Sequence, residues 1–532
     1  MTRGREVLLL LILVALCLTL FFFGLGARPL WDIDEGMHAA TSRDMVLSGD
    51  WITPKVNGEN FYDKPILYNW LAAVSFLIFG FTEFAARFPA AILGLGGVII
   101  TYLLGRKMFN PMVGFLGGVI LATNVEYVIL SRAVIHDISL CFFITLAFFC
   151  FYLGLGNVRR RKTYFLLSYA SLGFAVLAKG PVGLLLPILI IGLFILLRRR
   201  LSLLKEMEIG WGLLIFLLIA TPWYLLISLK NRDYGGYFFI QQNLMRFLSP
   251  EAHHHQPFYY YFPVLLGGFF PWSCFLPLAL IRALRLGSRE RDDGVVFVIV
   301  WFIVIFVFFS MASSKLSTYV LPLFPAASLL VGCLWHGLLR APTVQRQKGV
   351  LYTFIFLLAV VPVVSLYIRI NPPVRLESHY GVDLARLNSL VLLVSGGIAV
   401  GFLLFLIKNL RGSFVAMAGT VVTAILFLLV LMVPSVDPYR STKGLAQKVD
   451  QMLPPGEKLV FFDSLKDSAL FYTNRRALVL TTAQELEAYL ASDKRVFCIA
   501  EKRSLEDLEK ILKMSYIVAE EGGNLLLSNH KQ

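Results

Sequence analysis

The sequence predicts a mainly α-helical protein that crosses a membrane many times and ends in a small α/β domain. The 532 residues are 57% hydrophobic and only 16% charged, and the mean hydropathy is +0.72. A soluble protein of this length could not bury that much apolar surface. Apolar runs of about 20 residues recur along the chain, which is the length that a helix needs to cross a bilayer.

We interpret about thirteen of these runs as transmembrane helices. Their centres lie near residues 17, 96, 121, 146, 171, 189, 219, 272, 303, 328, 359, 397 and 423. The first run, at about residues 7–26, also resembles a signal peptide, because Arg3 and Arg5 precede it and Gly24–Ala27 offers small residues for cleavage. We favour an uncleaved anchor, because the apolar core of the run is long and many spans follow it.

Basic residues gather in every second loop between the spans. They are Arg3, Arg5, Arg106, Lys107, Arg159–Lys162, Arg198–Arg200, Arg282, Arg285, Arg289, Arg291, Arg340, Arg346, Lys348, Lys408 and Arg411. By the positive-inside rule these loops face the cytoplasm. The amino terminus is then inside, and an odd number of spans places the C-terminal end outside. The net charge of +15 follows this pattern and does not indicate nucleic acid.

The loops on the other side hold most of the unusual polar residues. These residues are Asp32, Asp34, Glu35, Asp63, Lys64, Arg132, His136, Asp137, Lys179, His253, His254, His255 and Lys315. A random scatter would divide them between the two faces. We infer one composite site at the extracytoplasmic surface of the membrane.

The composition changes after the last span. We predict a transmembrane domain over residues 1–436 and a periplasmic α/β domain over residues 437–532, because the stretch Pro434–Pro438 is rich in helix breakers. Within the second domain the pattern alternates between short strands and helices. Strands are expected at 457–462, 477–480, 495–500 and 516–519, and helices at 464–472, 483–491 and 504–513.

Three carboxylates follow the first span within four residues: Asp32, Asp34 and Glu35. One interpretation is a cap for a helix over about residues 35–48, where acids also favour the helix dipole. Three acids exceed what a cap needs, so we expect Asp32 to be the cap and at least one other to be a general base. Asp137 precedes the fourth span and has the same two interpretations, a cap or a second carboxylate of the site.

Three lysines lie where spans meet the extracytoplasmic loops. Lys64 lies in an aromatic first loop that is expected to form interfacial helices, Lys179 precedes Gly180–Pro181, and Lys315 lies between the ninth and tenth spans. A lysine ammonium suits a phosphate group, although each of the three could instead extend toward lipid head groups. We favour phosphate binding for Lys64 and keep both interpretations for the other two.

The run His253–His255 is a candidate for metal binding. Adjacent histidines cannot all face one ion from a regular helix or strand. One or two of them could bind a divalent metal together with Asp63 or another acid. The alternative is an exposed polar loop, which the run taken alone favours.

Together these motifs resemble the polyprenyl-phosphate-sugar glycosyltransferases. The similarity is nearest to the bacterial lipid A aminoarabinose transferases, which are related to the protein O-mannosyltransferases, and it covers nearly the whole chain. The residues that carry it are Pro29–Glu35, Arg43–Met45, Ser48–Trp51, Phe61–Pro65, Asp137, Ala178–Gly180, Ala252–His254, Pro257–Tyr261 and Lys315–Pro322.

The resemblance implies a C-type glycosyltransferase fold and a role for each motif. It assigns catalysis to Asp34, with Glu35 in support and Asp137 as a second aspartate at the membrane edge. It places the lipid phosphate at Lys64. It also pairs an acid before that lysine with a histidine at a metal site, here Asp63 with His254, and implies zinc there. Further candidates for substrate binding are Tyr62, Arg132, Lys179, Lys315 and Tyr319.

We therefore expect an inner-membrane enzyme that transfers a sugar from undecaprenyl phosphate to an envelope acceptor, with lipid A as the acceptor that the resemblance implies. A protein hydroxyl or another glycan is the alternative acceptor. From a different class, a lipid or sugar transporter commonly has internal repeats and charges at the bilayer midplane. The sequence shows no such repeat, and its unusual charges gather at one face. No nucleotide site is visible, which fits a donor whose own phosphate bond drives the transfer.

Overall fold

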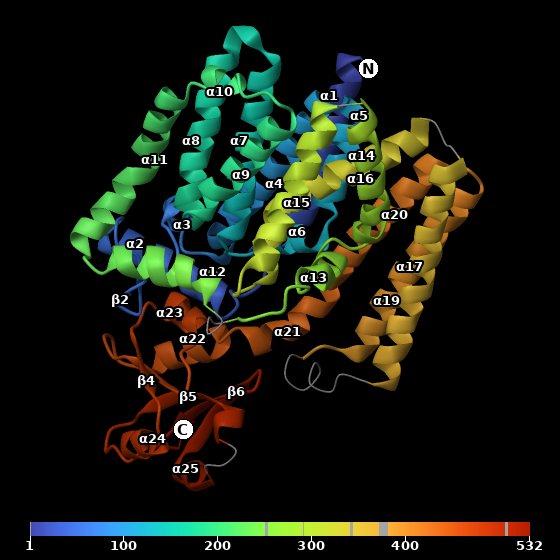
Figure 1. The fold of residues 1–532 in the computed structure, drawn as a ribbon. Helices are drawn as coiled ribbons and strands as arrows, with labels where there is room; N and C mark the ends of the chain where they lie inside the picture. Colours follow the sequence, from blue (N-terminus) through green and yellow to red (C-terminus); the bar gives the residue numbers. More distant parts are fainter. Residues whose placement is uncertain are drawn as a thin grey trace.

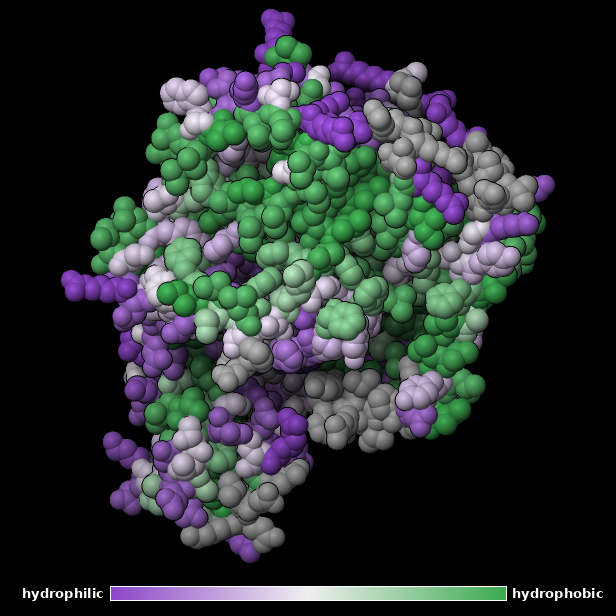
Figure 2. Space-filling view, in the orientation of Figure 1, coloured by the Kyte–Doolittle hydropathy of each residue, from purple (hydrophilic) through white to green (hydrophobic). Residues whose placement is uncertain are grey.

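The chain folds into a bundle of long apolar helices with a small sheet domain attached at one end (Figure 1). The computed structural model describes residues 2–249, 254–290, 292–340, 344–371, 381–505 and 509–531. The amino terminus lies at the end of the bundle opposite the sheet domain. We call the end that carries the sheet domain the C-terminal-domain side. Figure 2 shows a hydrophobic surface over the bundle and hydrophilic residues on the sheet domain and at the far end.

The bundle consists of helices with few charged residues in their interiors. They are α1 (Arg3–Cys17, extended by a π-helix over Leu18–Phe22), α4 (Glu83–Met108), α5 (Pro111–Ala122), α6 (Val125–Leu130), α7 (Asp137–Gly156), α8 (Arg161–Lys179), α9 (Val182–Leu197), α10 (Leu203–Glu206), α11 (Ile209–Lys230), α13 (Tyr261–Gly268), α14 (Leu276–Glu290), α15 (Asp293–Met311), α16 (Phe324–Arg340), α17 (Val344–Ile370), α19 (Leu384–Leu406) and α20 (Leu410–Phe427). One continuous buried apolar cluster runs through most of them. The mainly helical membrane fold is therefore confirmed.

Each of the thirteen predicted centres falls on a helix, but the helices differ in length. In the part of the chain that the structure describes, nine helices are long and apolar enough to cross a membrane, and a pair bent by 116° over Tyr261–Gly268 and Trp272–Arg285 would make a tenth. Helices α5 and α9 have only 12 and 16 residues. At 1.5 Å per residue, α5 covers about 18 Å of a hydrocarbon core of about 30 Å. By this criterion thirteen full spans is an overestimate.

The first loop forms a compact layer on the C-terminal-domain side. It contains α2 (Asp34–Ser48), the short strands β1 (Lys55–Val56) and β2 (Glu59–Asn60), and α3 (Leu67–Phe79). Helix α2 ends at Gly49, whose φ of +71° is a conformation that glycine adopts without steric cost. The expected helix over about residues 35–48 is present. Next to this layer lie a ten-residue π-helix (Gly236–Met245) and α12 (Arg246–Leu248).

The sheet domain follows α21 (Val433–Arg440) and α22 (Lys443–Met452). Its strand order is β4–β3–β5–β7–β6, with β4, β3 and β5 parallel and β7 antiparallel to both of its neighbours. The strands are β3 (Leu459–Phe462), β4 (Ala477–Leu480), β5 (Phe497–Glu501), β6 (Tyr516–Glu521) and β7 (Asn524–Ser528), and the helices are α23 (Asp467–Thr473), α24 (Ala483–Leu490) and α25 (Glu509–Met514). Two buried clusters, one on each face of the sheet, hold the layers together.

The four expected strands are present, and a fifth was missed. Strand β7 follows the turn Gly522–Gly523, in which both glycines have positive φ, the conformation that a tight hairpin needs. All five of its residues are buried. The Gly-Gly pair between two apolar stretches was the local signal that could have identified this hairpin.

Candidate active site

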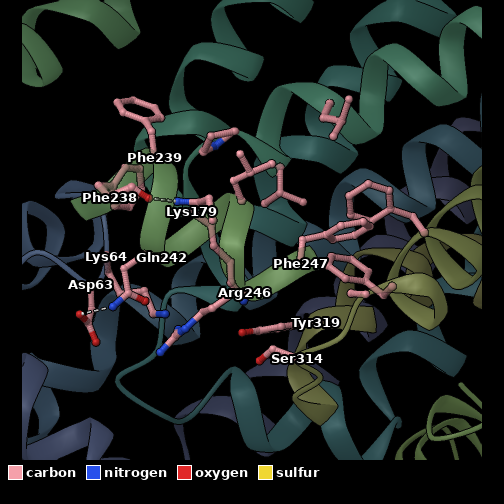
Figure 3. A pocket seen from close by; sticks show the side chains of 18 residues that line it. Asp63, Lys64, Lys179, Phe238, Phe239, Gln242, Arg246, Phe247, Ser314 and Tyr319 are labelled. Carbon is pink, nitrogen blue, oxygen red and sulfur yellow. Dashed lines mark hydrogen bonds between the residues drawn. The ribbon is translucent and has the colours of Figure 1, made fainter. Parts of the chain in front are cut away.

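A largely apolar pocket of about 360 Å³ opens on the C-terminal-domain side (Figure 3). Its walls come from the loop before α3, the turn between α8 and α9, the π-helix with α12, the end of α15, and the segment that leads to α16. The lining residues are Asp63, Lys64, Lys179, Pro181, Val182, Leu185, Phe238, Phe239, Gln242, Asn243, Leu244, Arg246, Phe247, Phe308, Phe309, Ala312, Ser314 and Tyr319. Most of them are hydrophobic, so the pocket suits a ligand that is itself mainly hydrocarbon.

Three cations face this pocket: Lys64, Lys179 and Arg246. The ammonium of Lys179 pairs with the Asp137 carboxylate and lies 4.4 Å from the centre of the Tyr319 ring. Neither Lys64 nor Arg246 makes a side-chain hydrogen bond or ion pair with any other described residue. Burial, together with the positive charges of Lys179 and Arg246, lowers the pKa of Lys64 to about 8, although the negative charges of Asp137 and Asp63 oppose this shift. Two cations are thus available to an anionic group.

The acids Asp34 and Asp137 occupy the first positions of α2 and α7. The Asp34 side chain is exposed to solvent. Partial desolvation by the surrounding protein raises its pKa, and the negative charges of Asp137 and Glu35 also raise it, while Lys64 and Lys179 lower it. Asp34, Asp137 and the two lysines therefore share one electrostatic environment.

The helices that carry these two acids also touch through buried histidines. His38 of α2 and His136, directly before α7, have ring centres 4.4 Å apart. Both side chains are 1% exposed. Burial lowers the pKa of His38 to about 3 and keeps it neutral near pH 7. This contact joins the two acid-bearing helix ends.

Glu35, the neighbour of Asp34, uses both of its carboxylate oxygens in hydrogen bonds within the protein. Its carboxylate accepts bonds from Arg87 Nε and Nη2 at 2.8 and 2.7 Å, from the Trp31 amide at 3.0 Å and from the Val134 amide at 3.2 Å. Glu35 and Arg87 are 9% and 4% exposed. Interaction with Arg87 holds the pKa of Glu35 below its usual range against the opposing effect of burial. The expected supporting acid thus anchors α2 to α4.

Three of the expected substrate-binding residues lie outside the pocket lining. Arg132 donates to the carbonyls of Leu20 and Phe23, where α1 and its π-helix end, at 2.9 and 2.8 Å. Lys315 is buried and donates to the carbonyls of Gln256 and Ala312. Tyr62 accepts from Asn60 at 2.7 Å and packs against Tyr234 and Tyr237. Lys64, Lys179, Tyr319 and Asp63 do line the pocket.

The expectation that Asp32 caps α2 is wrong. The residue before α2 is Ile33, with no side-chain cap. The Asp32 carboxylate instead accepts bonds from the amide and hydroxyl of Ser468, at 2.6 and 2.9 Å. Ser468 is the second residue of α23, so Asp32 caps a helix of the sheet domain instead of its own.

The residues expected to hold a metal do not assemble into a site. Asp63 accepts bonds from the Tyr237 hydroxyl at 2.7 Å and from Gln242 at 3.0 Å, and His254 uses its carbonyl for the Lys315 amide. Within the described ranges no group of three or more His, Cys, Asp and Glu side chains could hold a metal ion. His253 lies outside the described residues. The donor set therefore does not fit zinc, and we derive no step through a metal.

Sequence reasoning missed two arginines that matter here. Arg246 follows a ten-residue π-helix in a loop rich in aromatic residues, and only the folded chain brings it to Lys64. Arg87 lies in the first turns of the apolar helix α4, and an arginine in such a helix is itself a signal, because it needs a partner. The identity of that partner, Glu35, required the structure.

The architecture matches a solved membrane glycosyltransferase over its full length. ArnT from Cupriavidus metallidurans bound to undecaprenyl phosphate superposes with a TM-score of 0.83, covering 100% of this chain and 99% of that one at 24% sequence identity. The helical bundle, the acid-bearing first loop and the appended sheet domain therefore share the C-type glycosyltransferase fold of that structure.

Sequence comparison identifies the family. A family model described as dolichyl-phosphate-mannose-protein mannosyltransferase matches residues 63–225. An undecaprenyl phosphate-α-4-amino-4-deoxy-L-arabinose arabinosyl transferase of Proteus mirabilis is 30% identical over 382 residues, covering 69% of this chain and 68% of the relative. A protein of the same name from Aeromonas salmonicida is 34% identical over 361 residues, covering 66% and 64%. The chain belongs to this arabinosyl transferase family, whose enzymes use a polyprenyl-phosphate-linked sugar.

Proposed function

We propose that this protein transfers 4-amino-4-deoxy-L-arabinose from undecaprenyl phosphate to lipid A. The pair of uncommitted cations at one end of an apolar pocket is the observation that carries the proposal. Lys64 and Arg246 supply positive charge for a lipid phosphate. The phenylalanines of the same pocket, such as Phe238 and Phe308, offer apolar walls for the first isoprene units.

The acids beside the pocket supply the other half of the reaction. The acceptor hydroxyl oxygen attacks the anomeric carbon, the bond from that carbon to the phosphate oxygen breaks, and the hydroxyl proton passes to the Asp34 carboxylate. Undecaprenyl phosphate leaves with the bonding electrons, and the configuration at the anomeric carbon inverts. Lys64 and Arg246 stabilise the charge that grows on the leaving phosphate.

Asp137 has a positioning role in this scheme. It holds the Lys179 ammonium and adds a negative charge that raises the pKa of Asp34. A carboxylate with a raised pKa is a stronger base for a hydroxyl proton, as long as it stays ionised at the working pH.

We further propose that the site faces the periplasm. The basic loops favour a cytoplasmic amino terminus. The sheet domain and α12, which lines the pocket, lie at the opposite end of the bundle from the amino terminus. The division into a transmembrane domain over residues 1–436 and a periplasmic domain over residues 437–532 is also a proposal. Helix α21 crosses this boundary, because it runs from Val433 to Arg440.

The test is transfer by purified protein in vesicles that contain the aminoarabinosylated undecaprenyl phosphate and lipid A, with product mass as the readout. We expect a mass gain on lipid A with the wild type and at most about 1% of that rate with Asp34→Asn. Asp44→Asn is the matched control, because it makes the same change in the same helix and should leave the rate within about twofold. Equal rates for Asp34→Asn and wild type would remove the assignment of the base.

A protein hydroxyl is the second candidate acceptor, favoured by the family model that matches residues 63–225. The same vesicles can be supplied with a serine- and threonine-containing peptide in place of lipid A. Modification of the peptide alone would move the acceptor to protein and leave the donor assignment intact. Transfer to lipid A alone would exclude this candidate.

A further inference from the structure

The sheet domain contacts the bundle two residues from Asp34, at Asp32. Both carboxylate oxygens of Asp32 accept bonds from one residue, Ser468 of α23, at 2.6 and 2.9 Å. The Ser468 hydroxyl also lies 2.9 Å from that of Thr442, and Ser468 and Thr442 are 0% and 2% exposed. The Asp32 amide in turn donates to the carbonyl of Arg440 at 2.7 Å.

The backbones of α2 and α23 nearly touch at this point. A Cβ atom built on Gly36 would lie 2.4 Å from the Ser468 amide nitrogen, closer than any real contact of that kind. Helix α23 can therefore reach the Asp32 carboxylate only because residue 36 has no side chain. The two features occur together: a carboxylate that binds α23 and a glycine that admits it.

The same helix brings a further carboxyl group to the site. Asp467, the first residue of α23, is 6% exposed. Burial raises its pKa to about 7, and the charges of Asp32 and Asp34 contribute. The start of α23 is thus within electrostatic reach of Asp34, whose side chain makes no hydrogen bond with another described residue.

We propose that the bond from Asp32 to Ser468, which we call the clasp, positions Asp34, so that the sheet domain is a working part of the transferase site. Asp32 is a positioning residue in this scheme, because it does not touch the reacting atoms. The role of the clasp rests on the proposed function in one respect, that Asp34 takes part in the transfer. Asp34 is the first residue of α2. The clasp fixes the backbone on its amino-terminal side, and the rest of α2 fixes the backbone on its carboxy-terminal side.

The experiment compares Asp32→Ala with Asn57→Ala in the vesicle assay. Asn57 also bonds the sheet domain twice, through the amide and carbonyl of Ala477 at 2.6 and 3.0 Å, but it does so in the β1–β2 turn and not beside Asp34. We expect Asp32→Ala to lower kcat about 10- to 100-fold, because small errors in position have effects of that size. In Asp32→Ala, the donor KM and the affinity for undecaprenyl phosphate should stay within twofold of the wild type. Asn57→Ala should change neither kcat nor the donor KM.

Three further variants separate positioning from folding. Asp32→Asn keeps one acceptor oxygen and should recover part of kcat. Ser468→Ala keeps the backbone donor and should lower kcat less than Asp32→Ala, and the double variant Asp32→Ala/Ser468→Ala should be no slower than Asp32→Ala. If Asp32→Ala does not reach the membrane folded, Asp32→Asn and Ser468→Ala test the clasp in its place. The clasp then predicts that each lowers kcat and leaves the donor KM within twofold.

The outcomes distinguish this inference from the proposed function. Full activity of Asp32→Ala alongside an inactive Asp34→Asn would overturn the clasp and leave the transfer mechanism standing. A loss that appears in donor affinity instead of kcat, or that Asn57→Ala reproduces, would also overturn it. An active Asp34→Asn would remove the base assignment itself, whatever Asp32→Ala does.

Discussion

Charged side chains lie both in the pocket and at the base of α2, but only those at the base of α2 have partners within the protein. At the base of α2, Glu35 and Arg87 use their polar atoms within the protein: Glu35 accepts four bonds, and Arg87 also donates to the carbonyls of Leu25, Arg28 and Pro29. In the pocket, the side chains of Lys64 and Arg246 are half-buried and make no hydrogen bond or ion pair with any other described residue. Charges that lose part of their hydration normally find partners, so these two exceptions mark where a ligand belongs.

This difference separates two kinds of mutational effect. Changes in the network around Glu35 should reduce the amount of folded protein. Changes in the pocket should leave folding intact and reduce transfer. The following predictions, from the largest expected effect to the smallest, test that separation.

Replacing Arg87 should have the largest effect. Arg87→Met leaves the Glu35 carboxylate buried without its cation, which costs about 3–5 kcal/mol of unfolding free energy. We expect little folded protein in the membrane, measured by size-exclusion chromatography of detergent extracts.

The double variant Glu35→Gln/Arg87→Met removes both charges and should recover part of the folded fraction. If Arg87→Met were as stable as the wild type but inactive, Arg87 would belong with the reaction and the separation would fail.

Replacing Lys64 should reduce transfer without affecting folding. Lys64→Ala removes one donor to the leaving phosphate, and the loss of one such electrostatic contact lowers the rate about 100-fold. The vesicle assay gives the rate, and thermal unfolding in detergent should match the wild type. Lys55→Ala is the control, since Lys55 lies in the same loop and, among the residues that the structure describes, pairs only with Asp50, at 3.7 Å. An unfolded Lys64→Ala protein would place Lys64 among the structural charges.

The pH dependence of transfer should report the same lysine. The phosphate site needs the protonated amine, and the pKa of Lys64 is lowered to about 8, so the rate should fall as pH rises through about 8. Arginine stays protonated in this range, and Lys64→Arg should therefore lose the alkaline decline even if its maximal rate is lower. On the acid side, the rate should fall as pH falls, because Asp34 becomes protonated and can no longer accept the hydroxyl proton. Since the pKa of Asp34 is raised, this fall should begin at a higher pH than for an ordinary aspartate. An unchanged alkaline decline in Lys64→Arg would assign it to another group.

Most of the fold follows from patterns that are local in sequence. Apolar runs located the helices, and the change in composition located the sheet domain with four of its five strands. The errors arose at elements whose length or type the local pattern did not determine. Helix α5 was counted as a full span although it ends at Ala122, and β7 was missed although the Gly522–Gly523 turn before it was a local signal.

The site was less predictable, because a polar residue at a membrane edge can face a ligand or a backbone carbonyl. Lys64, Lys179 and Lys315 looked alike in the sequence, yet the first two line the pocket and Lys315 holds two carbonyls. The distinction depends on contacts between segments far apart in the chain. Asp32 shows this most clearly, since its partner Ser468 lies 436 residues away.

The smallest predicted effect concerns Tyr472, four residues beyond the clasp on α23. Its hydroxyl donates to Glu83 at 3.1 Å and accepts from the Leu30 amide at 2.7 Å. Tyr472→Phe removes these bonds, and Glu83 keeps its pairing with Lys443 at 2.6 Å, so the loss should be on the order of 1 kcal/mol. We expect a slightly lower unfolding temperature in detergent and a transfer rate within twofold of the wild type. A drop in kcat as large as that of Asp32→Ala would mean that the whole of α23, and not the clasp alone, sets the position of Asp34.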